Sequence, residues 1–284
     1  MKILLSVLLL MMSHSVWSAT LPTNKNDYCA RFNNPDAVRT FSIEPANLMN
    51  FKNQGGLFNG GVCWWHSRFQ RNIFYLAIFR PDLRPLEKRE VRNLIKEIRL
   101  GKTVVQIPGF HHFADFSHAY QKEIQAELEA WQLYDGVVLG SWIDGLQGDT
   151  HLEPAKLKHS LDVVYDYVEN KQKIAYQKLQ IKGITSHSWL VIGMKSGANG
   201  YDVGFVDSNN PRMTESYSYK NGEDSFFIKG YGNFVPYLGF TREEERLTTV
   251  ARSFCGQNLS LNTPEEQWEN DYALDLQEAR ESLP

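Results

Sequence analysis

The sequence has few cysteines: only Cys29, Cys63 and Cys255 occur among its 284 residues. Three cysteines are too few for the dense disulfide framework of a small secreted scaffold, and an odd number leaves one thiol over when the others pair. The C-x-x-C and H-E-x-x-H spacings that bind zinc are also absent from the sequence. We therefore predict no metal and no other cofactor, which leaves the unpaired thiol as the reactive group to account for.

Long apolar runs are confined to the amino-terminal end. Residues 3–12 are apolar apart from one serine, Lys2 precedes them, and small residues extend to Ser18. This arrangement is typical of a secretory signal peptide, and the run is too short to span a bilayer as a stable helix. We predict a signal peptide over residues 1–19, export to the periplasm or the extracellular space, and no stable membrane insertion after cleavage.

The sequence also lacks an excess of positive charge. Its 30 Lys and Arg residues are outnumbered by 33 Asp and Glu residues, for a formal net charge of −3. Binding of nucleic acid needs a basic surface that neutralises phosphates, so the composition argues against a nucleic acid as partner. The length of residues 20–284 suits one large domain or two small ones, with ample chain for a core, and we predict a single catalytic domain.

The local sequence around each cysteine suggests how they pair. Cysteines of an exported protein meet oxidising conditions and tend to form disulfides. Cys29 and Cys255 lie near the two ends of the mature chain, whereas Cys63 follows the glycine pair Gly60 and Gly61. We predict a disulfide between Cys29 and Cys255 that ties the ends together, with Cys63 as a free thiol.

Hydrophobic periodicity divides the chain into a helical part, about residues 57–172, and a β part, about residues 173–250. Helices first and strands later indicate an α+β fold. The predicted helices cover residues 63–79, 86–100, 114–133 and 154–170, with a carboxy-terminal helix over about 263–280. The predicted strands cover residues 104–107, 188–194, 201–207, 225–229 and 234–238, with residues 195–200 as a hairpin turn.

Cys63 has the surroundings of a nucleophile. It is predicted to open the helix of residues 63–79, where the positive end of the helix dipole favours a thiolate. The glycines before it let backbone amides approach a developing oxyanion closely. A second oxyanion donor is open among Asn53, Gln54 and Asn59, which all precede Cys63. The alternative interpretation is a buried, inert structural cysteine.

His187 is the best candidate for a base because it begins the first strand of the predicted hairpin. If Met194 pairs with Gly200, His187 faces Asp207, and a register two residues longer places it opposite Asn209. Asp207 and Asn209 share one face of their strand in either register. We favour Asp207 as the residue that orients the imidazole, with Asn209 as the alternative. His66, His111 and His112 are weaker candidates.

Two motifs together resemble the papain-like cysteine peptidase superfamily, and most of all its YopT-type branch. They are residues 61–65 (Gly-Val-Cys-Trp-Trp) and residues 187–209, which join a His-x-Trp strand to an Asp-x-Asn strand end. The resemblance implies a helical lobe led by the nucleophile helix, packed against an antiparallel β lobe, with a helical insertion between the motifs. Papain itself has a glutamine before the nucleophile where this sequence has Leu57.

These observations predict an exported cysteine peptidase that hydrolyses amide bonds of a protein or peptide substrate through Cys63, His187 and Asp207. The same three residues in this order also fit a transglutaminase-like or amidase acyl transferase. A different class of protein remains open as well, namely a non-catalytic binding protein held by its disulfide, in which Cys63 is inert.

Overall fold

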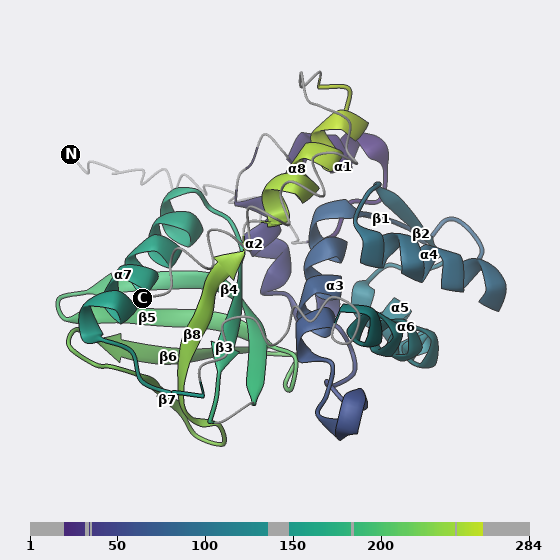
Figure 1. The fold of residues 1–284 in the computed structure, drawn as a ribbon. Coiled ribbons are helices and arrows are strands. Elements are labelled where there is room, and N and C mark those ends of the chain that lie inside the picture. Colours follow the sequence, from purple (N-terminus) through teal and green to yellow (C-terminus); the bar gives the residue numbers. More distant parts are fainter. Residues whose placement is uncertain are drawn as a thin grey trace, which may run out of the picture.

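The computed structural model describes residues 20–31, 34, 36–135, 148–182, 185–241 and 243–257. Within these ranges the chain folds into a helical lobe and an antiparallel sheet, with the long helix α3 (Cys63–Leu76) beside the sheet (Figure 1). The mixture of helices and strands confirms the predicted α+β class. The predicted signal peptide and the predicted helix of residues 263–280 lie outside the described residues.

The helical lobe is built around α3, which is buried along almost its whole length. Its apolar side chains Phe69, Ile73 and Phe74 belong to a continuous core that the surrounding helices complete. These helices are α1 (Lys25–Ala30), α2 (Ala37–Ser42), α4 (Lys88–Leu100), α5 (Phe113–Ala119), α6 (Gln121–Leu133) and α8 (Glu243–Phe254), with short 3-10 turns η2 (Pro45–Asn47) and η3 (Leu57–Asn59). The helix α8 was not predicted, and its Leu247 and Ala251 pack into this core.

The prediction that the first helix reaches residue 79 is wrong, because α3 ends at Leu76. Ala77–Arg80 forms strand β1, which pairs in parallel with β2 (Val105–Pro108). Ile78 and Phe79 are side chains that suit a strand as well as a helix, so the distant pairing decides their conformation. The predicted strand of residues 104–107 therefore has a partner that no local pattern indicated.

The second and third predicted helices differ in their outcome. The helix α4 ends at Gly101 as predicted, with Gly101 in the left-handed conformation at φ 60°. The single helix predicted over residues 114–133 is instead two helices, α5 and α6, separated at Tyr120. Tyr120 leaves the helical conformation, and its hydroxyl donates to the carbonyl of Leu86 at 3.1 Å. A tertiary contact thus interrupts a locally favourable helix.

The β lobe is a six-stranded antiparallel sheet in the order β6-β5-β4-β3-β8-β7. It curls so that it is nearly closed, and α7 (Pro154–Tyr165) with its π-helical last turn (Asp166–Asn170) packs on its core. The strands are β3 (Ala175–Gln180), β4 (Ser186–Gly197), β5 (Gly200–Asp207), β6 (Thr214–Lys220), β7 (Phe226–Ile228) and β8 (Gly232–Thr241). β3 and β6 were not predicted; the other four were.

The hairpin of β4 and β5 is longer than predicted. Gly197 pairs with Gly200, so the turn consists of Ala198 and Asn199 rather than of residues 195–200. The register shifts between Val191 and Gly193 at a β-bulge, and beyond it Trp189 pairs with Asp207. Met194 pairs with Val203 rather than with Gly200, and next to His187 the register is the longer of the two considered.

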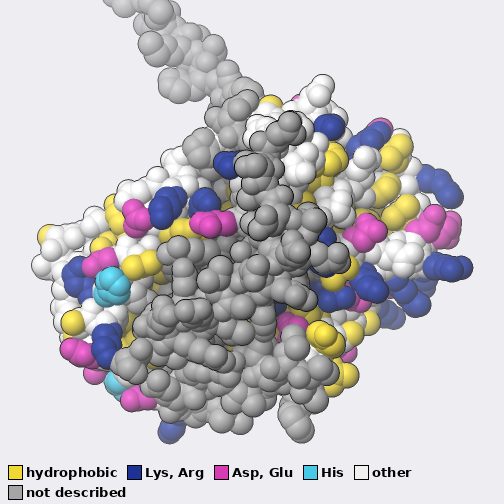
Figure 2. Space-filling model, turned by 45° about the horizontal axis from the view of Figure 1, so that its top comes forward, with side chains coloured by type: hydrophobic (Ala, Val, Ile, Leu, Met, Phe, Trp, Pro, Cys, Tyr) yellow, Lys and Arg dark blue, Asp and Glu magenta, His cyan; other side chains and the backbone are white. Residues whose placement is uncertain are grey.

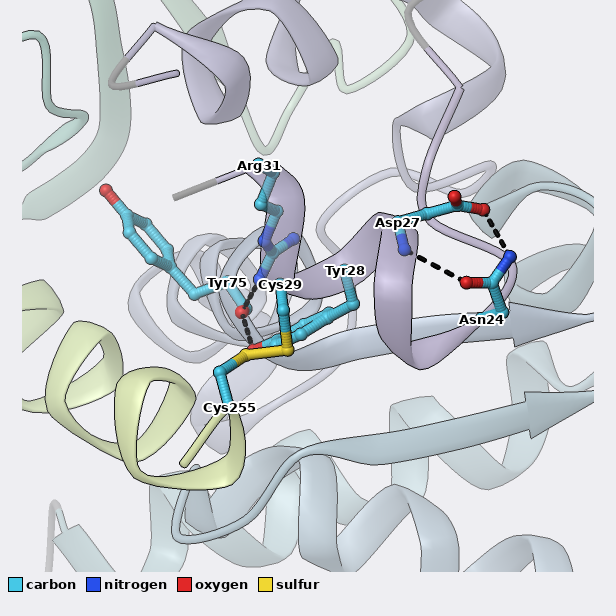
Figure 3. Close-up of a disulfide and its surroundings, with 7 residues drawn as sticks. All are labelled: Asn24, Asp27, Tyr28, Cys29, Arg31, Tyr75 and Cys255. Atoms are coloured by element: carbon cyan, nitrogen blue, oxygen red, sulfur yellow. Dashed lines mark hydrogen bonds between the residues drawn. A yellow bond between two sulfur atoms is a disulfide. The ribbon is translucent and has the colours of Figure 1, made fainter. Parts of the chain in front are cut away.

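The predicted disulfide between Cys29 and Cys255 is present, with Cα atoms 5.6 Å apart (Figure 3). It joins α1 to the residue that follows α8. Beside it, Arg31 and Tyr28 reach the carboxy-terminal end of α3: Arg31 donates to the carbonyls of Phe74 and Tyr75, and the Tyr28 hydroxyl donates to Tyr75. A cation at a helix carboxy terminus satisfies unpaired carbonyls and opposes the negative end of the dipole.

Among the described residues, no helix is long and apolar enough to cross a membrane. On the face shown in Figure 2, basic and acidic side chains are interspersed over the described surface.

Replacing both Cys29 and Cys255 with serine is expected to lower the free energy of unfolding by about 2–5 kcal/mol, because the disulfide closes a long loop and restricts the unfolded chain. Urea denaturation followed by tryptophan fluorescence measures the change. Cys63→Ser is the matched control, since it removes a thiol without breaking the crosslink. Equal stability of the double variant and the parent protein would contradict this role.

Candidate active site

Cys63 is the first residue of α3 and is buried. The preceding residue, Val62, caps the helix without a side-chain hydrogen bond, so no side chain occupies the first amides of the helix from that position. Gly61 adopts φ +87°, a left-handed conformation that a residue with a side chain rarely takes. The chain therefore turns sharply into α3, and the thiol sits at the positive end of its dipole.

His187 lies across from Cys63 at the start of β4 and is also buried. Its Nε2 atom lies 2.6 Å from Oδ1 of Asp207. The Cys63 thiol is close enough to raise the pKa of the imidazole, and its Sγ donates to the neighbouring Ser186 carbonyl at 3.9 Å. Because Nε2 donates to the carboxylate, Nδ1 is the nitrogen left to face the thiol. The structure thus brings together the three residues predicted from sequence.

The electrostatics of the pair favour a charged imidazole. Burial lowers the pKa of His187, but hydrogen bonds to Asp207 and Cys63, together with the charges of both groups, raise it to about 10. Burial raises the pKa of Asp207, and hydrogen bonds from His187, the Asn209 amide and Tyr231 outweigh this and hold it below its usual range. At neutral pH His187 is therefore an imidazolium beside an ionised carboxylate.

The strand register places Asp207 diagonally rather than directly opposite His187. Asp207 pairs with Trp189, so continuation of that register would set Asn209 opposite His187. Diagonal neighbours across an antiparallel pair remain within reach of long side chains. The carboxylate crosses this diagonal to the imidazole, whereas the Asn209 side chain turns toward Asn53 and Tyr231.

Tyr231 is a site residue that sequence reasoning missed. It lies in the turn between β7 and β8, and its hydroxyl donates to Oδ2 of Asp207 at 2.7 Å. Its ring stacks on the imidazole of His187, with centroids 5.0 Å apart and planes inclined by 27°. Gly230 and Gly232 flank it and have positive φ angles. A Gly-Tyr-Gly turn was the only local signal, and it points to a turn rather than to a site.

The oxyanion candidates end up in different places. Asn53 lies against the backbone before Cys63: its Oδ1 accepts from the Val62 amide at 2.5 Å, and its Nδ2 donates to Asn209 at 2.9 Å. The side chains of Gln54 and Asn59 are exposed. Asn53 is therefore bound on both sides, and the backbone amide of Cys63 is the donor that α3 itself directs toward the site.

One polar face of α6 holds the loop that leads to Cys63. Gln132 accepts from the Leu57 amide at 2.7 Å and donates to the Gly61 carbonyl at 2.8 Å. Glu129 accepts from the Gly56 amide at 3.2 Å, and Gln125 donates to the Gln54 carbonyl at 2.8 Å. Positions 125, 129 and 132 recur at helical spacing, so one face of a helix determines the path of the loop. Sequence reasoning did not connect these residues to the site.

The two lobes are also bound to each other next to Cys63. The Ser188 hydroxyl of β4 donates to the Cys63 carbonyl at 3.0 Å. The Ser67 hydroxyl of α3 donates back to the Ser188 carbonyl at 3.3 Å. These reciprocal bonds fix the first turn of α3 against the strand that carries His187, which sets the distance between thiol and imidazole.

His66, one turn after Cys63, belongs to the core rather than to the reacting groups. It is buried, and its Nε2 lies 3.0 Å from the Phe51 carbonyl. Burial lowers its pKa to about 4, so the imidazole is neutral at neutral pH. His111 is exposed and His112 is half-buried in the loop before α5. In the described ranges no group of three His, Cys, Asp or Glu side chains could hold a metal ion.

Comparisons with protein-family models, with curated proteins and with solved structures gave no match for this chain.

Replacement of Gly61 by alanine tests the turn into α3. A Cβ atom there would lie 2.5 Å from Nδ2 and 2.7 Å from Oδ1 of Asn53, so that side chain must move. We expect a loss of about 1–3 kcal/mol in the free energy of unfolding. Gly222→Ala is the matched control, because Gly222 has a similar φ of +95° and nothing within 4 Å of the added atom. If Gly61→Ala lowers the free energy of unfolding no more than Gly222→Ala does, the close contact with Asn53 does not require glycine at position 61.

The depressed pKa of His66 predicts a pH dependence of stability. The unfolded chain takes up a proton near pH 6.5, whereas the folded protein does so near pH 4, so stability is lost as pH falls between these values. As the pH falls through this range, the free energy of unfolding of the parent protein should decrease relative to that of His66→Phe by about 1.4 kcal/mol per pH unit. Urea denaturation at several pH values measures it, and a constant difference would show that the folded His66 titrates normally.

Proposed function

We propose that this protein is an exported cysteine peptidase, which hydrolyses amide bonds of a protein or peptide substrate with Cys63 as nucleophile, His187 as acid and base, and Asp207 as the orienting residue. One observation carries the proposal: a buried histidine hydrogen-bonds to a carboxylate through Nε2 and lies beside a cysteine at a helix amino terminus, whose presence raises the pKa of the imidazole. A cysteine so placed acquires thiolate character, and a thiolate is the nucleophilic form.

The division of the site between the lobes supports the same proposal. The helical lobe supplies Cys63, and adjacent strands of the antiparallel sheet supply His187 and Asp207. This is the arrangement that resemblance to the papain-like superfamily implies. The Cys29–Cys255 disulfide supports export, because such bonds persist mainly in oxidising compartments.

In the proposed reaction the thiolate sulfur of Cys63 attacks the carbonyl carbon of the scissile amide. The backbone amide of Cys63 donates to the oxyanion that forms. The imidazolium of His187 gives its proton to the departing amine, which leaves an acyl-enzyme thioester and a neutral imidazole. That imidazole then takes a proton from water as the water oxygen attacks the thioester carbon. Collapse of the resulting intermediate breaks the carbon–sulfur bond, which releases the carboxylic acid product and returns Cys63 as a thiolate beside the imidazolium of His187.

The role of Asp207 in this scheme is to orient and stabilise rather than to react. Its carboxylate holds the Nε2 proton of His187, which keeps Nδ1 directed at the sulfur and at the leaving group in turn. The backbone amide of Asn209 donates to Oδ1 of Asp207, and the Tyr231 hydroxyl donates to Oδ2, so both carboxylate oxygens are hydrogen-bonded. The carboxylate is therefore held in one orientation and stays ionised when the imidazole is charged.

Iodoacetamide labelling of the native protein as a function of pH tests the thiolate. A free cysteine has a pKa of ~8.5 and reacts little at pH 5, whereas a thiolate held by an imidazolium reacts there. We expect rapid labelling at Cys63 alone at pH 5, mapped by mass spectrometry, and a loss of about tenfold or more in that rate in His187→Ala. His118→Ala, which removes an exposed histidine of α5, is the control.

Labelling of Cys63 only after denaturation would overturn the enzyme proposal and favour a binding protein with an inert cysteine. If Cys63 is labelled at pH 5, peptide hydrolysis and transfer of the acyl group to an added primary amine should be compared on the same glutamine-containing substrate. Hydrolysis that Cys63→Ser abolishes supports the peptidase, whereas stable amine incorporation in its place supports the acyl transferase.

A further inference from the structure

A chain of hydrogen bonds leads from the backbone before Cys63 to the carboxylate of Asp207. The Val62 amide donates to Oδ1 of Asn53 at 2.5 Å, and Nδ2 of Asn53 donates to Oδ1 of Asn209 at 2.9 Å. Nδ2 of Asn209 then meets the Tyr231 hydroxyl at 2.5 Å, and that hydroxyl donates to Asp207 at 2.7 Å. We call the side chains of Asn53, Asn209 and Tyr231 the amide–tyrosine relay.

The direction of every bond in the relay is fixed by its two ends. A backbone amide can only donate, so the atom of Asn53 that faces Val62 is the oxygen, and its nitrogen must face Asn209. At the other end an ionised carboxylate can only accept, so the Tyr231 proton points at Asp207 and its oxygen is free to accept from Asn209. All donors thus point toward the carboxylate, and bonds aligned in this way polarise and strengthen one another.

The same assignment defines what Tyr231 does to His187. Tyr231 Oη lies 3.4 Å from Nε2 of His187, but both atoms carry protons that they donate to Asp207, so the two do not bond to each other. Instead the phenol ring covers one face of the imidazole. Tyr231 therefore restrains both partners of the pair: it holds Oδ2 of Asp207, and its ring is stacked on the imidazole at an inclination of 27°.

The relay also crosses between the lobes. Asn53 and Val62 belong to the loop that leads into α3, whereas Asn209 follows β5 and Tyr231 precedes β8. The backbone amide of Asn53 adds a further hydrogen bond, which it donates to the Ser208 carbonyl at 2.7 Å. A displacement of the nucleophile loop must therefore disturb the bonds that hold the orienting carboxylate.

From these contacts we infer that Tyr231 is a positioning residue of the proposed thiol enzyme, which acts with Asn209 and Asn53 to fix the His187–Asp207 pair relative to Cys63. The inference rests on the proposed function, since it concerns the same site. Tyr231 does not touch the reacting sulfur, so its effect reaches Cys63 through the imidazole. The titratable groups that surround His187 are Cys63 and His66 on α3, Asp207 on β5, and Tyr231 itself.

Tyr231→Phe removes one hydroxyl and keeps the stacked ring, so it tests the relay with little change in packing. In the iodoacetamide assay we expect the midpoint pH of Cys63 labelling to rise by about one unit while the rate at high pH is unchanged, because an imidazolium that is held less firmly stabilises the thiolate less. Tyr201→Phe is the matched control: it breaks a hydroxyl–carboxylate bond of the same 2.7 Å length, to Asp162, on the far part of the same sheet.

A second variant separates positioning from general stability. Asn209→Ala removes the side chain in the middle of the relay but keeps the Asn209 backbone amide that donates to Asp207. We expect it to raise the labelling midpoint in the same direction, and we expect the double variant Tyr231→Phe/Asn209→Ala to shift it no further than the larger single change, because residues of one chain of bonds are not additive. Asn209→Ala alone decides the question if Tyr231→Phe does not fold.

The outcomes distinguish this inference from the proposed function. If the parent protein is not labelled at pH 5, the thiol-enzyme proposal fails and the positioning role fails with it. If the parent protein is labelled at pH 5 and both variants keep its pH profile, the proposed function stands and the positioning role is overturned. Additive shifts in the double variant would likewise overturn the relay, because they would mean that Tyr231 and Asn209 act separately.

Discussion

The packing of the first turn of α3 against the start of β4 determines how the site is assembled. Ser188 and Ser67 exchange hydrogen bonds with the backbone at this junction, one toward the Cys63 carbonyl and one toward the strand. The helix brings the thiol and the strand brings the imidazole, so neither lobe alone contains a complete site. Buried hydroxyls and carbonyls are costly to leave unpaired, so these bonds favour the observed packing of the helix against the strand.

The buried pair of His187 and Asp207 depends on that junction and on the polar groups around it. Two charges removed from water are unfavourable unless each is hydrogen-bonded and paired. Here the carboxylate accepts from His187, from the Asn209 amide and from Tyr231. This full satisfaction makes a buried ion pair tolerable, and it also holds the groups in one geometry before a substrate arrives.

The loop that leads to Cys63 is held from both sides, which explains its composition. On one side the polar face of α6 binds its backbone through Gln125, Glu129 and Gln132. On the other side Asn53 lies so close to Gly61 that no side chain fits between them. Glycine there permits both the left-handed turn and the close approach, and the turn in turn aims the first amides of α3.

Local patterns predicted much of the helix and strand content, and they failed where distant contacts decide. The helix signal of residues 63–79 is continuous, yet the chain leaves the helix after Leu76 because β2 offers strand pairing. β3 was missed because its polar Gln177 lies in the core, where it accepts from the Trp189 indole at 2.8 Å. The bulge in β4 shifts the register by one residue, and a turn signal cannot reveal that.

By itself the sequence determined that Cys63 would begin a helix after a glycine turn, and that His187 and Asp207 would lie on neighbouring strands. These are consequences of helix-terminus chemistry and of the alternation of side chains along a hairpin, which act over short distances in sequence. The surroundings of the three cysteines also predicted the pair of Cys29 and Cys255, but the two lie 226 residues apart, so the fold decides that they meet. Only the tertiary structure decided that Asp207 reaches His187 across a diagonal, that Asn53 faces Val62, and that Tyr231 covers the imidazole. Those contacts depend on how the two lobes pack. They join residues that are far apart in the sequence, so no local sequence pattern indicates them.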